Sequence, residues 1–143
     1  MLKFTALAAC SVALAVVLAP QFASAEPVAL NVHVANVRPG GGEVRAALYD
    51  QDHWLATPVD AEAVAGDRAT VIVPLRAPNS GRYGIALYQD RNGDGQLNRG
   101  VFGMPTEPFA FSNAASASFG PPAFASAAFD VAAGAPEVTI TLP

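Results

Sequence analysis

Apolar residues stand at every second position in several short segments, and clusters of glycine and proline separate these segments. The segment 28–35 is the clearest case, with Val28, Leu30, Val32 and Val34 alternating with polar or small residues. A period of two places alternate side chains on opposite faces of a sheet, whereas a helix repeats every 3.6 residues. The chain is therefore expected to fold as short β-strands joined by turns.

The same alternation predicts six or more strands along the chain. They are expected at 28–35, 43–49, 68–73, 82–89, 128–132 and 137–142. The segment Pro-Gly-Gly-Gly at 39–42 predicts a hairpin-like start, and the polar segment 50–66 is expected to be a connection. Ala-Leu-Tyr occurs at both 47–49 and 86–88, which indicates two comparable core strands. The predicted fold class is all-β, an antiparallel β-sandwich.

The amino-terminal segment has the layout of a secretory signal. A lysine lies in residues 1–3, residues 4–19 are uncharged and largely apolar, and Ala-Ser-Ala precedes Glu26. This pattern predicts a cleaved signal peptide at 1–25 and a protein exported to the periplasm or the extracellular space. A retained anchor is the alternative, but the apolar run is shorter than the roughly 20 residues that span a bilayer. Cys10 has a lipoprotein-like context, yet cleavage there would leave an apolar segment downstream.

The predicted mature chain, residues 26–143, is long enough for a single domain with its own core. It has no cysteine, so it must be stable in an oxidising compartment without disulfides. Its arginines are scattered singly and it has no lysine, which argues against nucleic acid as a partner. No second apolar span follows residue 25, so no integral membrane segment is expected after signal cleavage.

The segment 90–98 resembles the first part of a calcium-binding loop. Oxygen-bearing side chains stand at relative positions 1, 3, 5 and 9, with glycine at position 6. The predicted metal ligands are Asp90, Asn92, Asp94, Gln96 through its carbonyl, Asn98 and Glu107. Glu107 is included because Val101 occupies the position of the usual bidentate acid, so the chain would have to fold back.

The motif itself supplies only two carboxylates, Asp90 and Asp94. This predicts a weak calcium site, with a dissociation constant of about 10⁻⁴ to 10⁻³ M. The segment also contains Asn-Gly and Asp-Gly pairs, which form Asx-rich turns without any metal. The sequence leaves both interpretations open.

All six phenylalanines of the predicted mature chain fall within one proline-rich segment. They are Phe102, Phe109, Phe111, Phe119, Phe124 and Phe129. A loop longer than about 12–15 residues is commonly a binding loop or is packed by its own side chains. The segment is expected either to expose an apolar surface to a ligand or to cover the sandwich with its rings.

The ordered motifs of the chain resemble a known family. Gly-Arg-Tyr at 81–83, the loop at 90–97, the segments 102–113 and 120–124, and Ala-Ala-Phe at 127–129 resemble bacterial exported proteins with the domain of unknown function 2141. The resemblance covers essentially the whole predicted mature chain. It implies an exported, uncharacterised protein without established catalytic residues, whose strand pattern is similar to immunoglobulin-like or transthyretin-like sandwiches.

The residues give little support to enzymatic chemistry. The chain has no cysteine nucleophile after residue 25, no Gly-x-Ser-x-Gly motif, and its two histidines, His33 and His53, lie in separate segments. We expect a noncatalytic binding or structural module of the cell envelope, with Ca²⁺ as its candidate ion and a protein, glycan or small molecule as its partner. The alternative is a small periplasmic hydrolase or metal-dependent enzyme that uses Asp90, Asp94, Glu107 or His53.

Overall fold

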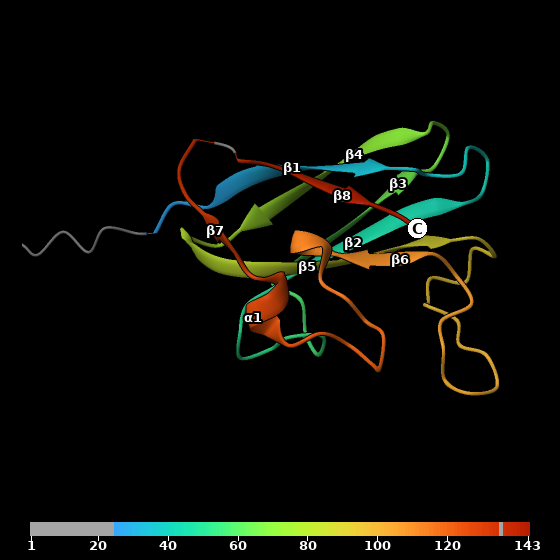
Figure 1. Ribbon diagram of the computed structural model, residues 1–143. Coiled ribbons are helices and arrows are strands. Elements are labelled where there is room, and N and C mark those ends of the chain that lie inside the picture. The colour runs from blue at the N-terminus through green and yellow to red at the C-terminus, as the bar shows by residue number, and fades with distance from the viewer. Residues whose placement is uncertain (1–24, 135) are drawn as a thin grey trace, which may run out of the picture.

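The computed structural model describes residues 25–134 and 136–143. The predicted signal peptide lies outside the described residues, apart from Ala25, and stays a prediction. The described residues form eight strands, one turn of 3-10 helix and one short α-helix (Figure 1). These are β1 (Val28–Ala35), β2 (Glu43–Tyr49), β3 (Asp60–Ala65), β4 (Thr70–Ala77), β5 (Gly81–Asp90), β6 (Phe109–Phe111), η1 (Ser112–Ala114), α1 (Phe124–Ala127), β7 (Phe129–Val131) and β8 (Glu137–Thr141).

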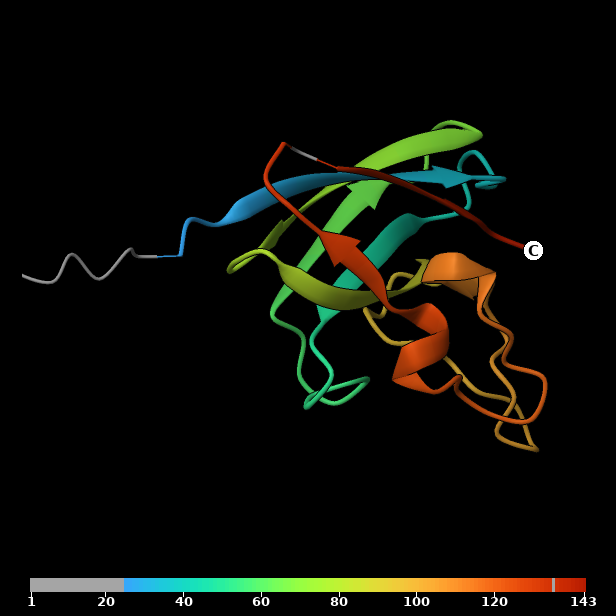
Figure 2. The same cartoon turned by 60° about the vertical axis from the view of Figure 1, so that its left-hand side comes forward.

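The strands form two sheets that enclose one hydrophobic core (Figures 1 and 2). One sheet has the order β4-β1-β8, and the other has the order β3-β2-β5-β6, with β7 also paired to β5. The apolar positions of the predicted alternation point inward, so that Leu30, Val32, Leu48 and Ile85 are almost completely buried. The all-β prediction is confirmed.

Two expectations about strand pairing are wrong. β1 and β8 run parallel, with Val34 opposite Ile140, because the chain crosses from β7 in one sheet to β8 in the other. The glycine cluster before β2 does not close a hairpin either, since β1 and β2 belong to different sheets. Gly42 has a φ of +95°, and a β-carbon there would lie 1.8 Å from the Asp90 carbonyl oxygen. Glycine is required at this crossing because another backbone approaches it closely.

Two strands were not expected from the sequence. β3 lies at the edge of its sheet, within the segment predicted to be a connection, and pairs with β2. Most of its side chains are exposed, so burial imposes no apolar alternation on its sequence. β6 spans only three residues inside the aromatic segment. Period-two patterns cannot reveal strands that are this short or this exposed.

Ser112 joins the segments that follow β6 to the middle of the five-stranded sheet. Its side chain is fully buried, and its Oγ accepts a hydrogen bond from the Ile85 amide at 2.9 Å. The same hydroxyl donates to the Ala127 carbonyl oxygen at 2.5 Å. Ser112 thereby connects β5 to the segment before β7, and this connection positions the long aromatic loops on the sheet.

We predict that Ser112→Ala lowers the free energy of unfolding by about 1–3 kcal/mol, because it leaves the buried Ile85 amide without an acceptor. Chemical denaturation measures this loss. Ser116→Ala is the matched control, since the Ser116 hydroxyl is exposed and bonds only to Ser118. A Ser112 variant as stable as the Ser116 variant would contradict the assignment.

Candidate functional site

The outer face of the five-stranded sheet carries side chains in rows that cross the strands. In one row Arg45 of β2 lies opposite Tyr88 of β5, and Tyr88 lies opposite Phe109 of β6. In the next row Ala47 lies opposite Ala86, with Ala61 of β3 on its other side. A row of alanines therefore lies beside a row of large side chains, which leaves a depression across the sheet.

An aromatic cluster bounds this depression on the side of Tyr49. The Trp54 ring contacts three other rings at centroid distances of 5.5–6.0 Å, those of Tyr49, Phe111 and Phe124. Its Nε1 donates to the Pro122 carbonyl oxygen at 2.8 Å. A β-carbon at Gly84 would lie 2.7 Å from Trp54 Cζ3, so glycine is required beneath the indole. The cluster fixes the loop that follows β2 against the loop that precedes α1.

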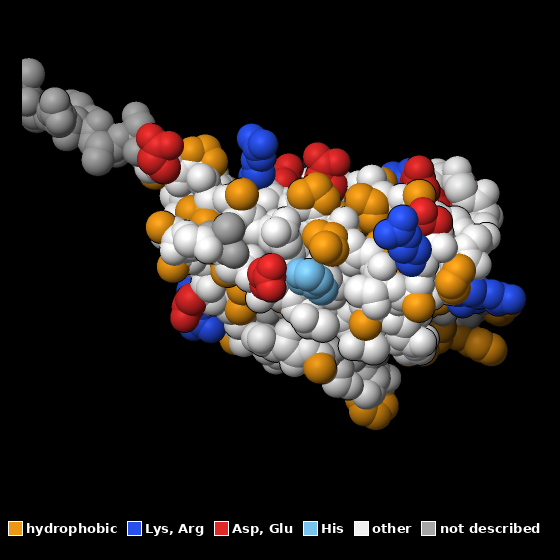
Figure 3. All heavy atoms as spheres, turned by 90° about the horizontal axis from the view of Figure 1, so that it is seen from above, with side chains coloured by type: hydrophobic (Ala, Val, Ile, Leu, Met, Phe, Trp, Pro, Cys, Tyr) orange, Lys and Arg blue, Asp and Glu red, His pale blue; other side chains and the backbone are white. Residues whose placement is uncertain are grey.

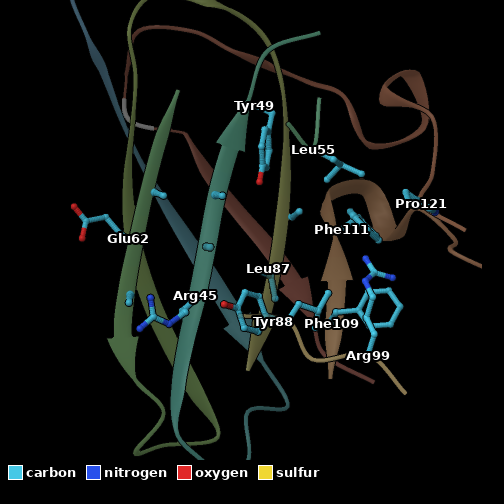
Figure 4. A pocket seen from close by; sticks show the side chains of 16 residues that line it. Arg45, Tyr49, Leu55, Glu62, Leu87, Tyr88, Arg99, Phe109, Phe111 and Pro121 are labelled. Atoms are coloured by element: carbon cyan, nitrogen blue, oxygen red, sulfur yellow. The ribbon is translucent and has the colours of Figure 1, made fainter. Parts of the chain in front are cut away.

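The depression is a groove of about 650 Å³ on this face. Its floor includes the alanines of β2, β3 and β5. Its walls carry Tyr49, Tyr88, Phe109, Phe111 and Arg99. In Figure 4 the hydroxyl of Tyr49 points along the groove, and that of Tyr88 points toward Arg45. Partial burial raises the pKa of both tyrosines, so the two hydroxyls are neutral donors near pH 7.

Asp90 ends β5 with a fully buried carboxylate next to the groove. Its Oδ1 accepts from the Gly93 amide and its Oδ2 from the Gly95 amide, each at 2.8 Å. Arg45 Nε donates to the same Oδ2 at 3.2 Å, while another guanidinium nitrogen bonds to Glu43. Asp90 therefore holds both the 90–98 loop and the arginine that borders the groove.

Glu107 lies against the two ends of the 90–98 loop. Its carboxylate accepts from the Arg91 amide at 2.8 Å and from the Asn98 amide at 3.1 Å. The chain does fold back, as the calcium hypothesis required. The exposed Asp94 makes a separate group of bonds, because it accepts from Asn98 Nδ2 at 2.7 Å and from the Gln96 amide at 2.9 Å.

The bond from the Asn98 side chain is the largest factor that lowers the pKa of Asp94, followed by the bond from the Gln96 amide. Asn92 contributes to the same lowering. Because the pKa of Asp94 is lower in the folded protein than in the unfolded chain, the ionised carboxylate stabilises the folded loop at pH values above the unfolded-state pKa. This contribution is lost as the pH falls through the folded-state pKa.

The structure brings all six predicted metal ligands into one loop region, although in two groups. Asp90 and Glu107 bind backbone amides, whereas Asp94 is surrounded by Asn92, Gln96 and Asn98. Within residues 25–134 and 136–143, no cluster of three or more Asp, Glu, His or Cys residues is arranged to hold a metal ion. Amide and carbonyl oxygens also bind calcium, so calcium binding stays a prediction.

The two histidines lie away from the groove floor. His53 is exposed, and its amide and Nδ1 both lie within 2.9 Å of Asp50 Oδ1, an interaction that lowers the pKa of Asp50. His33 Nε2 lies 3.7 Å from Glu137, and both residues belong to the three-stranded sheet, away from the groove. Figure 3 views the molecule from above, and there apolar and charged side chains are interspersed without a concentrated patch. These positions give the groove no acid–base pair.

The groove floor is the feature that the sequence analysis missed. Alanine has no motif of its own, and nothing in one sequence shows that Ala47 and Ala86 are neighbours on one face. The repeated Ala-Leu-Tyr was the available signal, because it placed equivalent residues on two core strands. Four of the six phenylalanines cover the sheet at least in part, whereas Phe102 and Phe119 are exposed.

The fold and the groove define an all-β protein with its candidate site on the outer face of a sheet. A family model described as an uncharacterized protein conserved in bacteria (DUF2141) matches residues 32–139. The chain belongs to this family, as its motifs indicated. No curated protein and no solved structure matches the chain.

No helix in the described part of the chain has the length and apolar character needed to cross a membrane.

We predict that Asp90→Ala lowers the free energy of unfolding by about 3 kcal/mol in the presence of a chelator, because two amides and Arg45 lose their buried acceptor. Asp94→Ala removes an exposed carboxylate from the same loop and serves as the matched control. It should unfold at nearly the wild-type denaturant concentration. Equal losses in the two variants would contradict the assigned role of Asp90.

Proposed function

We propose that the protein is a noncatalytic binding module of the cell envelope, and that the groove on the outer face of the five-stranded sheet takes its ligand. The observation that carries this proposal is the alanine row. Ala47, Ala61 and Ala86 leave open a surface that larger side chains would fill. A sheet face that served only as a structural layer would need no such depression.

The walls of the groove indicate the chemistry of the ligand. Tyr88, Phe109 and Phe111 offer aromatic surfaces, and the two tyrosine hydroxyls offer polar contacts. Arg99 adds a positive charge, although one of its guanidinium nitrogens already donates to the Gly103 carbonyl oxygen at 2.9 Å. This combination suits a small molecule or glycan fragment with one flat apolar face and hydroxyl or anionic groups at its edge.

Export of the protein is part of the same proposal. The signal pattern at 1–25 and the cysteine-free domain that follows it both support this location. Two sheets around one core support a sandwich of the immunoglobulin-like or transthyretin-like type, with the parallel β1–β8 pair at one edge. Within this framework the groove would face the contents of the envelope.

Calcium would order the 90–98 loop that borders the groove. Two features support this part of the proposal. The side chains of Asn92, Asp94 and Asn98 are gathered around one turn. The Oδ1 of Asn98 is also buried without a hydrogen-bond partner, and carbonyl oxygens of this kind are calcium ligands. A bound ion would stabilise the wall that Arg45 and Leu97 form.

We predict that anilinonaphthalene sulfonate, which has flat apolar rings and one anionic group, binds the folded protein in the groove. Ala47→Leu with Ala86→Leu fills the floor and should weaken binding about tenfold, since it removes the space for one ring. Fluorescence titration measures the affinity. Ala29→Leu makes the same change on an exposed position of β1 and should bind like wild type.

Thermal unfolding of each variant shows whether it stays folded during the dye titration. If the filled variant is folded and binds the dye as tightly as wild type, the groove is not the binding site.

We predict that calcium raises the melting temperature of the protein with a dissociation constant of about 10⁻⁴ to 10⁻³ M. Asp94→Ala should abolish this rise while melting like wild type in chelator. Magnesium is the control ion, since it demands a more rigid octahedral site and should have little effect. A melting temperature independent of calcium would remove calcium from the proposal.

A further inference from the structure

An apolar hairpin projects from the loop region between β5 and β6. Arg99 pairs with Pro105 in an isolated antiparallel bridge, and the chain turns between them. Val101 and Phe102 at the tip are 95% and 94% exposed, and Met104 is 60% exposed. Large apolar side chains in a folded domain normally lose most of their exposure, so this tip is a surface that another phase or molecule would cover.

The residues at the tip are unusual for their position. The Gly103 amide donates to the Gly100 carbonyl oxygen at 3.0 Å, which places Val101 and Phe102 at the two central positions of a turn. Gly103 follows with a φ of +74°. Central turn positions favour Asn, Asp, Ser, Gly or Pro for conformational reasons. Turn geometry therefore does not explain a valine and a phenylalanine here.

Part of the tip's backbone is paired within the hairpin. The Gly100 amide donates to the Met104 carbonyl oxygen at 2.8 Å, and Arg99 donates to the Gly103 carbonyl oxygen at 2.9 Å. A segment that enters an apolar phase must pair its polar backbone groups internally. The hairpin meets this condition at Gly100, at Gly103 and at the Met104 carbonyl oxygen, which flank the two apolar residues, and the arginine at its base carries the positive charge.

The segment that contains the hairpin carries very few charges. The chain has twelve acidic residues, yet Arg99 and Glu107 are the only charged residues from Gly95 to Phe129. Glu107 is buried and bonds to two backbone amides. The loop with the fully exposed Phe119 extends on the same side as the hairpin in Figures 1 and 2. An acidic protein thus contains a long apolar segment in which Arg99 is the one exposed charge.

We propose that the 99–105 hairpin inserts Val101 and Phe102 into the surface of a lipid bilayer that contains anionic headgroups. Val101 and Phe102 are almost fully exposed at the end of a hairpin, so a protein partner would need a matching pocket, whereas lipid chains accommodate any shape. Arg99 lies at the base of the hairpin, at the level of the headgroups, where arginine side chains interact with phosphate. Arg99 also lines the groove, so membrane docking and ligand binding would share this side chain.

The test uses the chain from residue 26, which contains every described strand and excludes the apolar segment 4–19. Flotation with vesicles of phosphatidylethanolamine and phosphatidylglycerol measures binding. The double variant Val101→Ser, Phe102→Ser should lower the bound fraction about tenfold, since it removes the inserted apolar area. Ile72→Ser is the matched control, because Ile72 is a half-exposed apolar residue on β4 and should leave binding unchanged.

A second measurement reports insertion directly. The chain from residue 26 has no cysteine, so the Val101→Cys variant can be labelled at that one thiol with an environment-sensitive fluorophore. The Ala29→Cys variant, labelled in the same way on β1, is the control. Emission from residue 101 should shift to the blue with vesicles, and emission from residue 29 should not.

Wild-type protein that fails to float, or a double serine variant that floats as well as wild type, would overturn the proposal. So would a tip that causes concentration-dependent dimerisation without vesicle binding, because the hairpin would then contact a second copy of the chain.

Discussion

A buried carboxylate at the end of β5 determines how the loops are arranged on the sheet. Asp90 is fully enclosed and binds two glycine amides and Arg45, so the loop that follows must turn back at once. Its carbonyl oxygen also faces Gly42, at the point where the chain changes sheets. A buried charge without these partners would cost several kcal/mol, on the order of a third of a domain's stability. The arrangement of the groove and its loops therefore depends on the hydrogen bonds that the Asp90 carboxylate accepts.

The outer face of the five-stranded sheet shows how size alone creates a site. Trp54 over Gly84 and Tyr88 beside Arg45 leave the alanine row uncovered between them. Because adjacent strands hold these residues in register, the depression is part of the sheet itself. Loops from three parts of the chain then complete its walls. A ligand would thus contact a rigid floor and loops of differing sequence.

The sequence predicted the features that repeat regularly and missed those that depend on pairing. Alternation located β1, β2 and β5 because each has a buried and an exposed face, and the oxygen-rich motif located the 90–98 loop. β3 was not predicted, because most side chains of this edge strand are exposed and its sequence shows no apolar alternation. The alanine floor could not be predicted, because one sequence does not show which residues of two strands lie opposite each other. The role of Glu107 required knowing that the chain folds back over sixteen residues to the Arg91 amide.

The parallel pairing of β1 with β8 has a consequence for the order of assembly. The strand nearest the start of the domain lies beside the strand nearest its end, and the Asn36 side chain bonds to the Leu142 carbonyl oxygen across 106 positions. Contacts so distant along the chain form slowly, because a long loop must close first. The smaller sheet therefore cannot be completed before residues 137–141 are available to pair with β1. A chain folded only as far as β7 would leave one edge of β1 unpaired, open to any other strand until β8 arrives.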